Sequence, residues 1–416
     1  MGKVYVIGAG LAGLSAATWL AARGQSVVLI EGAGQAGGRC RSYFDPAMDA
    51  VIDNGNHLVL SGNRAVHDYL ARIGASAGLA GPDRAVFPFV DLRDGTRWTL
   101  QPDEGPLPFW MASNRRRVPG TRLGDYLRYL PLLWAGKEAR IDRCVPPQGA
   151  LWDRLMKPFF VAALNTAPEE SSAALAGAVL RETLAKGGRH YRPRIAHPTL
   201  AAAFVDPALA YIAAHGGTVR LGTRLRGLSR EGCAVTALEL PDGATALTRK
   251  DAVVLAVPPW AAADLVPGLT VPDRFHAIVN AHYKMPRPSG APAMLGVVGG
   301  TAEWIFAFDD RISVTCSFAD AIVDLDREEL AARIWADVAR ALNIASPMPP
   351  WQIVKEKRAT FAATPQQDAR RPAARSGLRN LFLAGDWTQT GLPATIEGAL
   401  RSGETAAALA LRHLSV

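Results

Sequence analysis

The sequence predicts an α/β fold, with a parallel sheet that begins near the N-terminus and a second domain of mixed α+β structure. The first observation behind this prediction is a short apolar run that breaks directly into a glycine-rich turn and then a helical stretch. The second observation is length. The chain has 416 residues, which exceeds what one hydrophobic core usually supports, so about two domains are expected.

The opening segment has the pattern of a dinucleotide-binding turn. Residues 4–7 are mostly β-branched and predict a buried strand, while residues 14–23 favour a helix. Between them, Gly8 permits a sharp turn, Gly10 lets a pyrophosphate approach the backbone, and Gly13 lets the helix pack closely on the strand. The N-terminus of the helix then faces the phosphates. The residues expected around the pyrophosphate are Gly8, Gly10, Leu11, Ala12 and Gly13.

An acidic residue follows the second predicted strand. Residues 26–30 read as this strand, and Glu31 comes directly after it. Its carboxylate can accept hydrogen bonds from a ribose 2′-OH, and it argues against a 2′-phosphate and hence against NADP. Because strand, helix and acid occur together, we favour a dinucleotide site over an ordinary glycine-rich turn.

A second glycine-rich segment, residues 34–42, favours FAD over NAD. Gly37 and Gly38 are adjacent and expose backbone N–H groups, and Arg39 offers a planar guanidinium to a phosphate or carboxylate. The alternative interpretation is a solvated basic loop.

These segments resemble the flavin amine oxidase and carotenoid desaturase superfamily, in which the glycine-arginine loop lies beside the FAD pyrophosphate. Residues 380–388 form a hydrophobic strand that ends in Gly-Asp, and residues 393–403 begin a helix, as in that superfamily. A helix N-terminus aimed at the flavin would stabilise the anionic reduced form. The resemblance places five residues at the FAD phosphate, the ribityl chain and the flavin ring: Gly385, Asp386, Ala394, Thr395 and Ile396.

The resemblance also implies a discontinuous, amine-oxidase-like architecture, in which a Rossmann-type FAD-binding domain alternates along the chain with the mixed α+β substrate domain. The backbone at Leu225 is expected to meet the adenine. The expected FAD-binding parts are residues 1–75, 199–268 and 365–416, and the expected substrate-domain parts are residues 76–198 and 269–364.

Apolar spacing predicts further elements. We expect a helix over residues 65–73 and a hairpin over residues 86–100. His282, Lys284 and Arg287 are interpreted either as polar groups of an active site or as part of a surface loop. In the second half of the chain, strands are expected around residues 293–298, 304–308 and 312–318, and a helix around residues 327–342.

Three segments narrow the resemblance to one branch. Residues 53–63, 164–168 and 385–398 resemble the hydroxysqualene dehydroxylases, the squalene-associated FAD enzymes of hopanoid synthesis. The implied substrate is the C30 isoprenoid hydroxysqualene, and the implied product is squalene. In the implied reaction an acid protonates the departing oxygen, and N5 of reduced flavin delivers hydride to the allylic cation. An electron donor must then regenerate the reduced flavin.

His57 is the candidate catalytic residue. The resemblance brings residues 53–57 to the flavin, and an imidazole titrates near neutrality and can donate a proton. The alternative is that His57 hydrogen-bonds the backbone or shapes the loop, and Asp53 is interpreted as a turn or structural acid. No cysteine occurs between residues 380 and 416, so the FAD is expected to be non-covalent.

The composition indicates which binding partners and which cellular compartment to expect. The net charge of +8 could favour an anionic membrane surface or a nucleic acid, but no nucleic-acid motif is present. The four cysteines are widely spaced without a zinc-ligand pattern, so we expect a reducing compartment and no metal site. We find neither a cleavable leader nor a run of about 20 apolar residues. A cytoplasmic protein is therefore expected, either soluble or peripheral on the cytoplasmic membrane face.

Residues 107–143 mix apolar side chains with positive charge. Such a segment could dip into lipid while its arginines meet the headgroups. The alternative is that the apolar side chains pack within the substrate domain and the arginines are merely solvated.

Two other functions are compatible with the pattern. One is an FAD-dependent amine oxidase or carotenoid-type desaturase, which would run the flavin in the opposite direction. The other is a non-catalytic prenyl-lipid-binding protein of the same fold, a reading that the intact set of Glu31, Arg39 and Asp386 disfavours.

Overall fold

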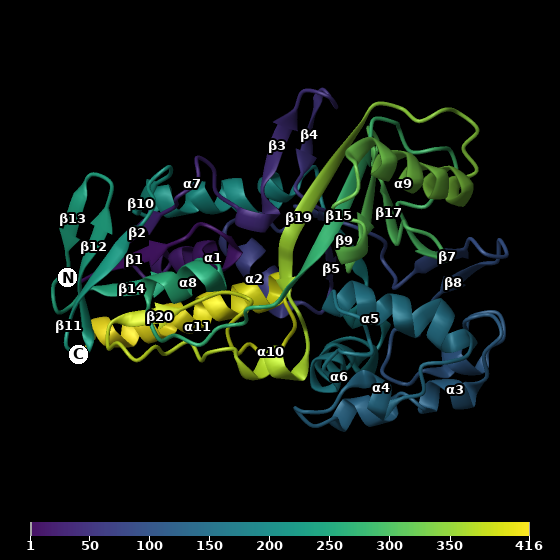
Figure 1. Cartoon of the computed structure of the whole chain (residues 1–416), viewed down its shortest axis with the longest axis horizontal. Helices are drawn as coiled ribbons and strands as arrows, with labels where there is room; N and C mark the ends of the chain where they lie inside the picture. Colours follow the sequence, from purple (N-terminus) through teal and green to yellow (C-terminus); the bar gives the residue numbers. More distant parts are fainter. Residues whose placement is uncertain (1, 416) are drawn as a thin grey trace.

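The computed structural model describes residues 2–415 and contains two main sheets with helices packed against them (Figure 1). The first is a parallel sheet with the strand order β10-β2-β1-β14-β20. Because its strands are parallel, all their carboxyl ends meet at one edge. The strands are β1 (Lys3–Ile7), β2 (Ser26–Ile30), β10 (Thr218–Arg220), β14 (Ala252–Leu255) and β20 (Leu381–Leu383).

Helices α1 (Leu11–Ala21) and α11 (Ile396–Leu414) lie side by side against this sheet (Figure 1). Their approach is close, since a Cβ added to Gly403 would lie 2.2 Å from the Ala12 carbonyl oxygen. Ser15 Oγ also donates a hydrogen bond of 2.9 Å to the Leu400 carbonyl. The other helical elements in the part of the molecule that contains the parallel sheet are α2 (Arg64–Arg72), the π-helical turn η7 (Ala201–Val205), α7 (Asp206–Ala214), α8 (Pro259–Leu265) and α10 (Pro365–Ala369).

The second sheet is mixed and has the strand order β19-β15-β18-β17-β16-β7-β8. Only β16 and β7 pair in parallel. Helix α9 (Arg327–Leu342) covers one face with apolar contacts. The strands are β7 (Phe87–Asp91), β8 (Arg97–Leu100), β15 (Phe275–Tyr283), β16 (Met294–Val298), β17 (Trp304–Ala307), β18 (Ile312–Cys316) and β19 (Trp351–Phe361).

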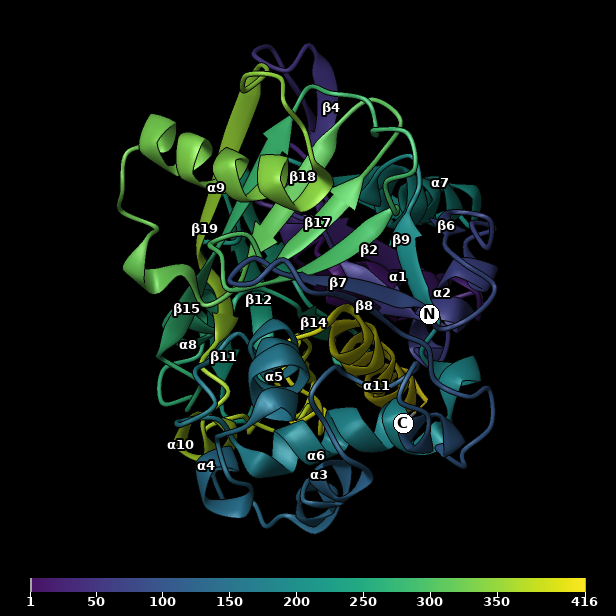
Figure 2. The same cartoon turned by 90° about the vertical axis from the view of Figure 1, so that its right-hand side faces the viewer.

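A helical part of the chain lies at the lower end of the molecule in Figure 2, where α3, α4, α5 and α6 are labelled. It continues the apolar core that also reaches the mixed sheet. Its elements are η2 (Phe109–Ala112), α3 (Leu123–Leu127), η3 (Leu130–Trp134), α4 (Ile141–Cys144), η4 (Trp152–Met156), α5 (Lys157–Leu164), α6 (Ala173–Glu182), η5 (Leu184–Lys186) and η6 (Gly188–His190).

Smaller elements join these parts. Strands β3 (Ser42–Asp45) and β4 (Ala50–Asp53) form a hairpin that stands away from the body at the top of Figure 1. A second small sheet contains β5 (Leu58–Leu60), β9 (Pro193–Ala196) and β6 (Leu79–Ala80), and a third contains β11 (Gly227–Glu231), β12 (Ala234–Leu240) and β13 (Gly243–Ala246). Two further 3₁₀ turns are η1 (Gly38–Cys40) and η8 (Ala319–Ala321).

The expected elements recur in the structure, but two long strands were missed. The predicted strand over residues 26–30 and helix over residues 327–342 match β2 and α9. Apolar periodicity did not predict β15 or β19. In β19 the pattern is interrupted by a charged run in the middle of the strand, from Lys355 to Arg358. His282 lies fully buried in β15, so the surface-loop interpretation is wrong for this residue. Within residues 2–415, no helix is long and apolar enough to cross a membrane.

Candidate active site

The first glycine turn forms an open cradle at the N-terminus of α1. Gly8 adopts φ +104°, and a Cβ on Gly13 would lie 1.8 Å from the Gly8 carbonyl oxygen, so both positions require glycine. Gly10 is the N-cap of α1 and supplies no side-chain cap, and an added Cβ there would meet no atom within 4 Å. The free N–H groups of the first helical turn therefore face open space that suits a pyrophosphate.

The second glycine loop closes over the first. The Gly37 N–H donates a hydrogen bond of 2.8 Å to the Ala9 carbonyl. Gly37 also forms an isolated parallel β-bridge with Gly10. A Cβ on Gly38 would lie 3.4 Å from the Gly10 Cα. The two loops that the sequence marked as phosphate-binding are thus in contact.

Glu31 lies at the carboxyl end of β2, where it organises the neighbouring backbone. Its two carboxylate oxygens accept hydrogen bonds from the Ala9 N–H at 2.7 Å and the Ala33 N–H at 2.8 Å. An ionised carboxylate offers about four acceptor sites, so two remain for ribose hydroxyls. The segment before Leu225 lies alongside, since the Thr223 N–H donates to the Glu31 carbonyl at 2.8 Å. Leu225 itself is buried, which fits a position beside an adenine.

Arg39 joins the second glycine loop to the far end of the chain. Its guanidinium donates to Asp386 Oδ2 at 2.7 Å and to the Ala359 carbonyl at 2.5 Å. Asp386 is buried, and the Gly385 N–H before it donates to Ser402 Oγ at 2.8 Å. A paired Arg39 therefore supplies positive charge next to the cradle without leaving a buried charge unmatched.

The N-terminus of α11 is held by two sets of contacts. Thr395 is its N-cap, and the Thr395 Oγ1 accepts a hydrogen bond of 3.0 Å from the Gly398 N–H. Ala394 and Ile396 flank this cap and are partly exposed. That this helix N-terminus meets the flavin ring stays a prediction.

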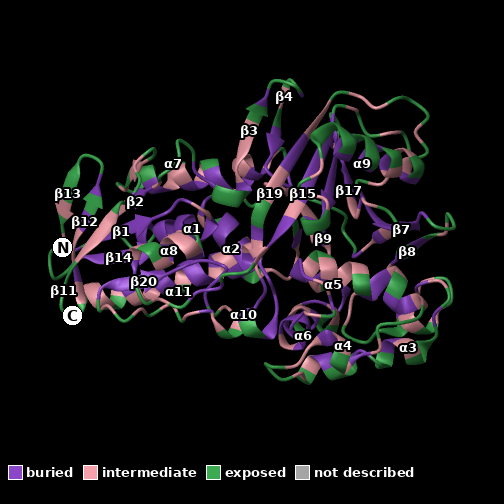
Figure 3. Ribbon diagram, viewed as in Figure 1, coloured by how far each residue is buried: buried purple, intermediate pink, exposed green. Residues whose placement is uncertain are grey.

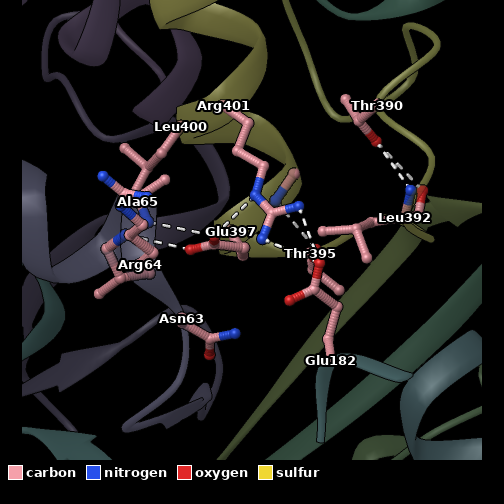
Figure 4. Close-up of polar contacts among 12 residues, drawn as sticks. Asn63, Arg64, Ala65, Glu182, Thr390, Leu392, Thr395, Glu397, Leu400 and Arg401 are labelled. Atoms are coloured by element: carbon pink, nitrogen blue, oxygen red, sulfur yellow. Dashed lines mark hydrogen bonds and ion pairs between the residues drawn. The ribbon is translucent and has the colours of Figure 1, made fainter. Parts of the chain in front are cut away.

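Glu397, in the first turn of α11, is buried and ties three helices together (Figure 4). Its carboxylate accepts hydrogen bonds of 3.1 Å from the N–H groups of Ala65 and Val66, at the N-terminus of α2. Arg401 Nε donates to the same carboxylate at 2.7 Å, and the Arg401 guanidinium reaches Glu182 Oε1 on α6 at 3.3 Å. This clamp connects α11 to α6, which belongs to the helical part of the chain.

The loop of residues 53–57 is anchored on the mixed sheet. Asn56 Nδ2 donates to Thr315 Oγ1 at 3.3 Å, and Asn280 Nδ2 donates to the Asn54 carbonyl at 3.4 Å. A Cβ on Gly55 would lie 2.8 Å from Asn280 Nδ2, so a larger residue there would displace the Asn280 side chain. The interpretation of Asp53 as a structural acid agrees with its contacts, since its Oδ1 accepts hydrogen bonds from Ser42 Oγ and from the Leu200 N–H.

This anchored loop places His57 beside Arg39. Burial, followed by the positive charge of Arg39, lowers the pKa of His57 to about 4. The imidazole is therefore neutral at neutral pH, which differs from the expectation that it titrates near neutrality. The two causes are the loss of water around the ring and the permanent cation next to it.

A large apolar cluster reaches the site at Trp387. It includes stacked Phe89 and Trp98, with ring centroids 5.3 Å apart, and Trp304 packed edge-on against Phe89 at 5.5 Å. Trp387, directly after Asp386, belongs to the same cluster. The burial colouring in Figure 3 shows buried residues running through the strands of both sheets. Trp387 therefore places apolar surface next to Asp386.

Several functional contacts had weak sequence signals. Asn280 is an isolated amide among buried apolar residues of β15, and this contrast is the signal that could have found it. Glu397 lies within the matched tail motif, but its partners Ala65 and Val66 are far away in the sequence. Within residues 2–415, no cluster of three or more His, Cys, Asp or Glu side chains has the geometry of a metal site.

Comparison with known proteins agrees with this geometry. Residues 11–411 match the family model of flavin-containing amine oxidoreductases. A hydroxysqualene dehydroxylase of Sinorhizobium fredii is 52% identical over 98% of both chains, and one of Rhodopseudomonas palustris is 53% identical over 98% of both chains. The solved structure of cyclohexylamine oxidase from Brevibacterium oxydans superposes with a TM-score of 0.72 over 100% of both chains at 15% identity, which shows the shared fold.

We predict that Glu31→Ala weakens FAD binding by roughly tenfold or more, because a hydrogen bond to a charged group contributes about 1.5–3 kcal/mol. The measurement is a fluorescence titration of the apoprotein with FAD. Glu231→Ala, at the exposed end of β11, is the matched control and should bind FAD like the wild type. An unchanged affinity in Glu31→Ala would contradict the ribose assignment.

We also predict that the free energy of unfolding falls as pH is lowered from about 6.5 to about 4. Burial, together with nearby Arg311, lowers the pKa of His282 to about 4, as burial and Arg39 do for His57. In this window the unfolded chain binds protons that the folded chain excludes, so acid favours unfolding. Urea denaturation at a series of pH values should show a flatter dependence for His282→Gln than for the control His215→Gln at the exposed end of α7. Equal slopes would contradict the assignment.

Proposed function

This chain belongs to the family of flavin-containing amine oxidoreductases, and we propose that it acts as a hydroxysqualene dehydroxylase, reducing hydroxysqualene to squalene with FAD. The observation that carries the proposal is its likeness to hydroxysqualene dehydroxylases along almost the entire chain. The cradle formed by the two glycine loops, Glu31 and Arg39 supports the cofactor.

The reaction exchanges a C–O bond for a C–H bond. Bound in its reduced form, FAD supplies hydride to the allylic carbon from which the hydroxyl leaves as water, and it is itself oxidised. One proton is consumed in forming the water. The protein must therefore hold the cofactor, orient the allylic carbon, deliver a proton to the oxygen and exclude bulk water.

The cofactor is held by elements from both ends of the chain. The first turn of α1 and the guanidinium of Arg39 would hold the phosphates, and Glu31 would accept hydrogen bonds from the ribose. The N-terminus of α11, capped by Thr395, would offer its partial positive charge to the flavin. These contacts are non-covalent.

A C30 hydrocarbon requires apolar surroundings beside the cofactor, and the buried Trp387, directly after Asp386, supplies apolar surface there. Exclusion of water at this place would protect an allylic cation from attack by bulk water.

His57 is our candidate for the polar group at the leaving hydroxyl. Since its pKa is lowered to about 4, it acts as a neutral ring whose N–H donates a hydrogen bond to the departing oxygen. Arg39, beside it, disfavours a charged imidazole. In this role the N–H of His57 holds the departing oxygen in place, and the proton that completes the water comes from another donor.

An electron donor must return two electrons to the cofactor after each turnover, because every product molecule leaves it oxidised. We place the reaction on the cytoplasmic face of a membrane, where the apolar substrate dissolves. We expect the four cysteines, which form no disulfide in the structure, to stay reduced there.

We predict that anaerobic mixing of the reduced, FAD-loaded protein with hydroxysqualene yields one squalene per flavin reoxidised. Absorbance follows the flavin, and mass spectrometry follows squalene. Protein loaded with oxidised FAD is the control and should form none. Reduced flavin that persists without product would overturn the proposal, and rapid reduction of the oxidised protein by an amine would instead favour an amine oxidase.

We predict that His57→Ala slows squalene formation about 10²-fold while FAD stays bound, because the variant lacks the N–H that hydrogen-bonds to the departing oxygen. The measurement is the single-turnover rate under the same anaerobic conditions. His215→Ala, in an exposed position, is the matched control. A rate equal to that of the wild type would remove His57 from the mechanism.

A further inference from the structure

The helical part exposes an unusual concentration of apolar side chains. In the described part of the chain, ten large hydrophobic side chains are exposed, and six of them lie within residues 107–134. Phe109 and Trp134 are 71% and 77% exposed. We call the six the apolar rim: Leu107, Phe109, Leu123, Leu127, Leu130 and Trp134.

The apolar rim is not left over from an incomplete core. The same short helices already bury an inner set of apolar side chains, which includes Trp110, Tyr126 and Leu132. Trp110 and Tyr126 pack edge to face with ring centroids 5.3 Å apart. A segment whose outer face met only water would carry polar residues there, so the outward apolar set requires another explanation.

The rim is presented on a fixed support. The Trp110 N–H donates to Asp103 Oδ2 at 2.7 Å, and the Val118 N–H donates to the Tyr126 hydroxyl at 3.0 Å. Helix α6 lies directly beneath η3, since a Cβ on Gly177 would lie 2.0 Å from the Leu132 carbonyl oxygen. The exposed side chains therefore project from an ordered surface.

Positive charge surrounds the rim. Residues 107–143 contain eight arginines and lysines and three acidic residues, a net charge of +5 within a chain whose total is +8. Arg115, Arg122 and Arg128 are exposed. Asp125, one of the three acids, is already used to accept a hydrogen bond of 2.7 Å from the Arg122 N–H.

We propose that the apolar rim docks the protein on an anionic lipid bilayer, with Phe109 and Trp134 inserted at the boundary between headgroups and acyl chains. Arginines around the rim pair with lipid phosphates, which is the combination that holds peripheral proteins on membranes. This inference rests on the proposed function for its purpose, because the isoprenoid substrate and product dissolve in the bilayer. In Figure 1 the rim helices lie at the lower right, at the opposite end of the molecule from both termini.

The charge favours a bilayer over a second copy of the chain. Two copies meeting through the rim would bring two segments of net positive charge together, and this repulsion opposes association. A bilayer that contains anionic lipid supplies the opposite charge and an apolar interior together.

The test is flotation of the FAD-loaded protein with vesicles of phosphatidylcholine and phosphatidylglycerol in equal parts. We expect the wild type to float, and the double variant Phe109→Ser and Trp134→Ser to partition at least about tenfold more weakly, since burying each side chain is worth about 1.5–3 kcal/mol. Arg115→Gln with Arg128→Gln should weaken binding roughly fivefold per arginine, and only on anionic vesicles.

Phe44→Ser is the matched control. Phe44 is 60% exposed, but it lies on β3, in the hairpin that stands at the top of Figure 1, away from the rim. It should float like the wild type. All of these variants should convert detergent-dispersed hydroxysqualene at the wild-type rate, because none of the changed residues belongs to the cofactor or substrate machinery.

Two results would overturn the docking proposal: a wild type that fails to float, or a rim variant that floats equally well. A wild type that dimerises through the rim in sedimentation velocity and ignores vesicles would also overturn it, in favour of a second copy. Failure of the proposed function is distinct, since it would appear as a lack of squalene from detergent-dispersed substrate whatever the vesicles show.

Discussion

The parallel pairing of β1 with β2 and β14 is the constraint on which the site depends. It brings the carboxyl ends of strands from distant parts of the chain to one edge, so that Gly10, Glu31 and Asp386 can serve one cofactor. The close packing of α1 on α11 then aims two helix N-termini at the same region. Neither end of the chain could form this site alone.

The local part of this arrangement could be predicted from the sequence. The strand, glycine turn and helix around Gly10, and the acid at Glu31, depend on residues adjacent in the chain, so their pattern carries its own mechanical reasons. Asp386 and Leu225 were placed only through a family resemblance, because their contacts join segments about 200 residues or more apart in the sequence. Apolar periodicity gave no signal for β19, whose middle is charged.

The side-chain environment was harder still to predict. His57 was expected to titrate near neutrality, yet its pKa depends on burial and on Arg39, and neither can be read from the loop sequence. The anchoring of that loop by Asn280 and Thr315 requires β15 and β18 to be neighbours in the sheet, which is a property of topology. The signal for this contact in the sequence is Asn280, a polar residue within the otherwise mostly apolar strand β15.

The clamp formed by Glu397, Arg401 and Glu182 connects α11 to the helical part of the chain. Helix α6 carries Glu182 at its C-terminal end and supports η3, with its exposed Trp134, through the close contact at Gly177. The same helix therefore contacts both η3 and, through Arg401, helix α11. Because Glu397 is buried and accepts three hydrogen bonds, the N-terminus of α11 is also tied to α2. A chain of polar contacts thus couples the surface that is rich in apolar side chains to the N-terminus of α11.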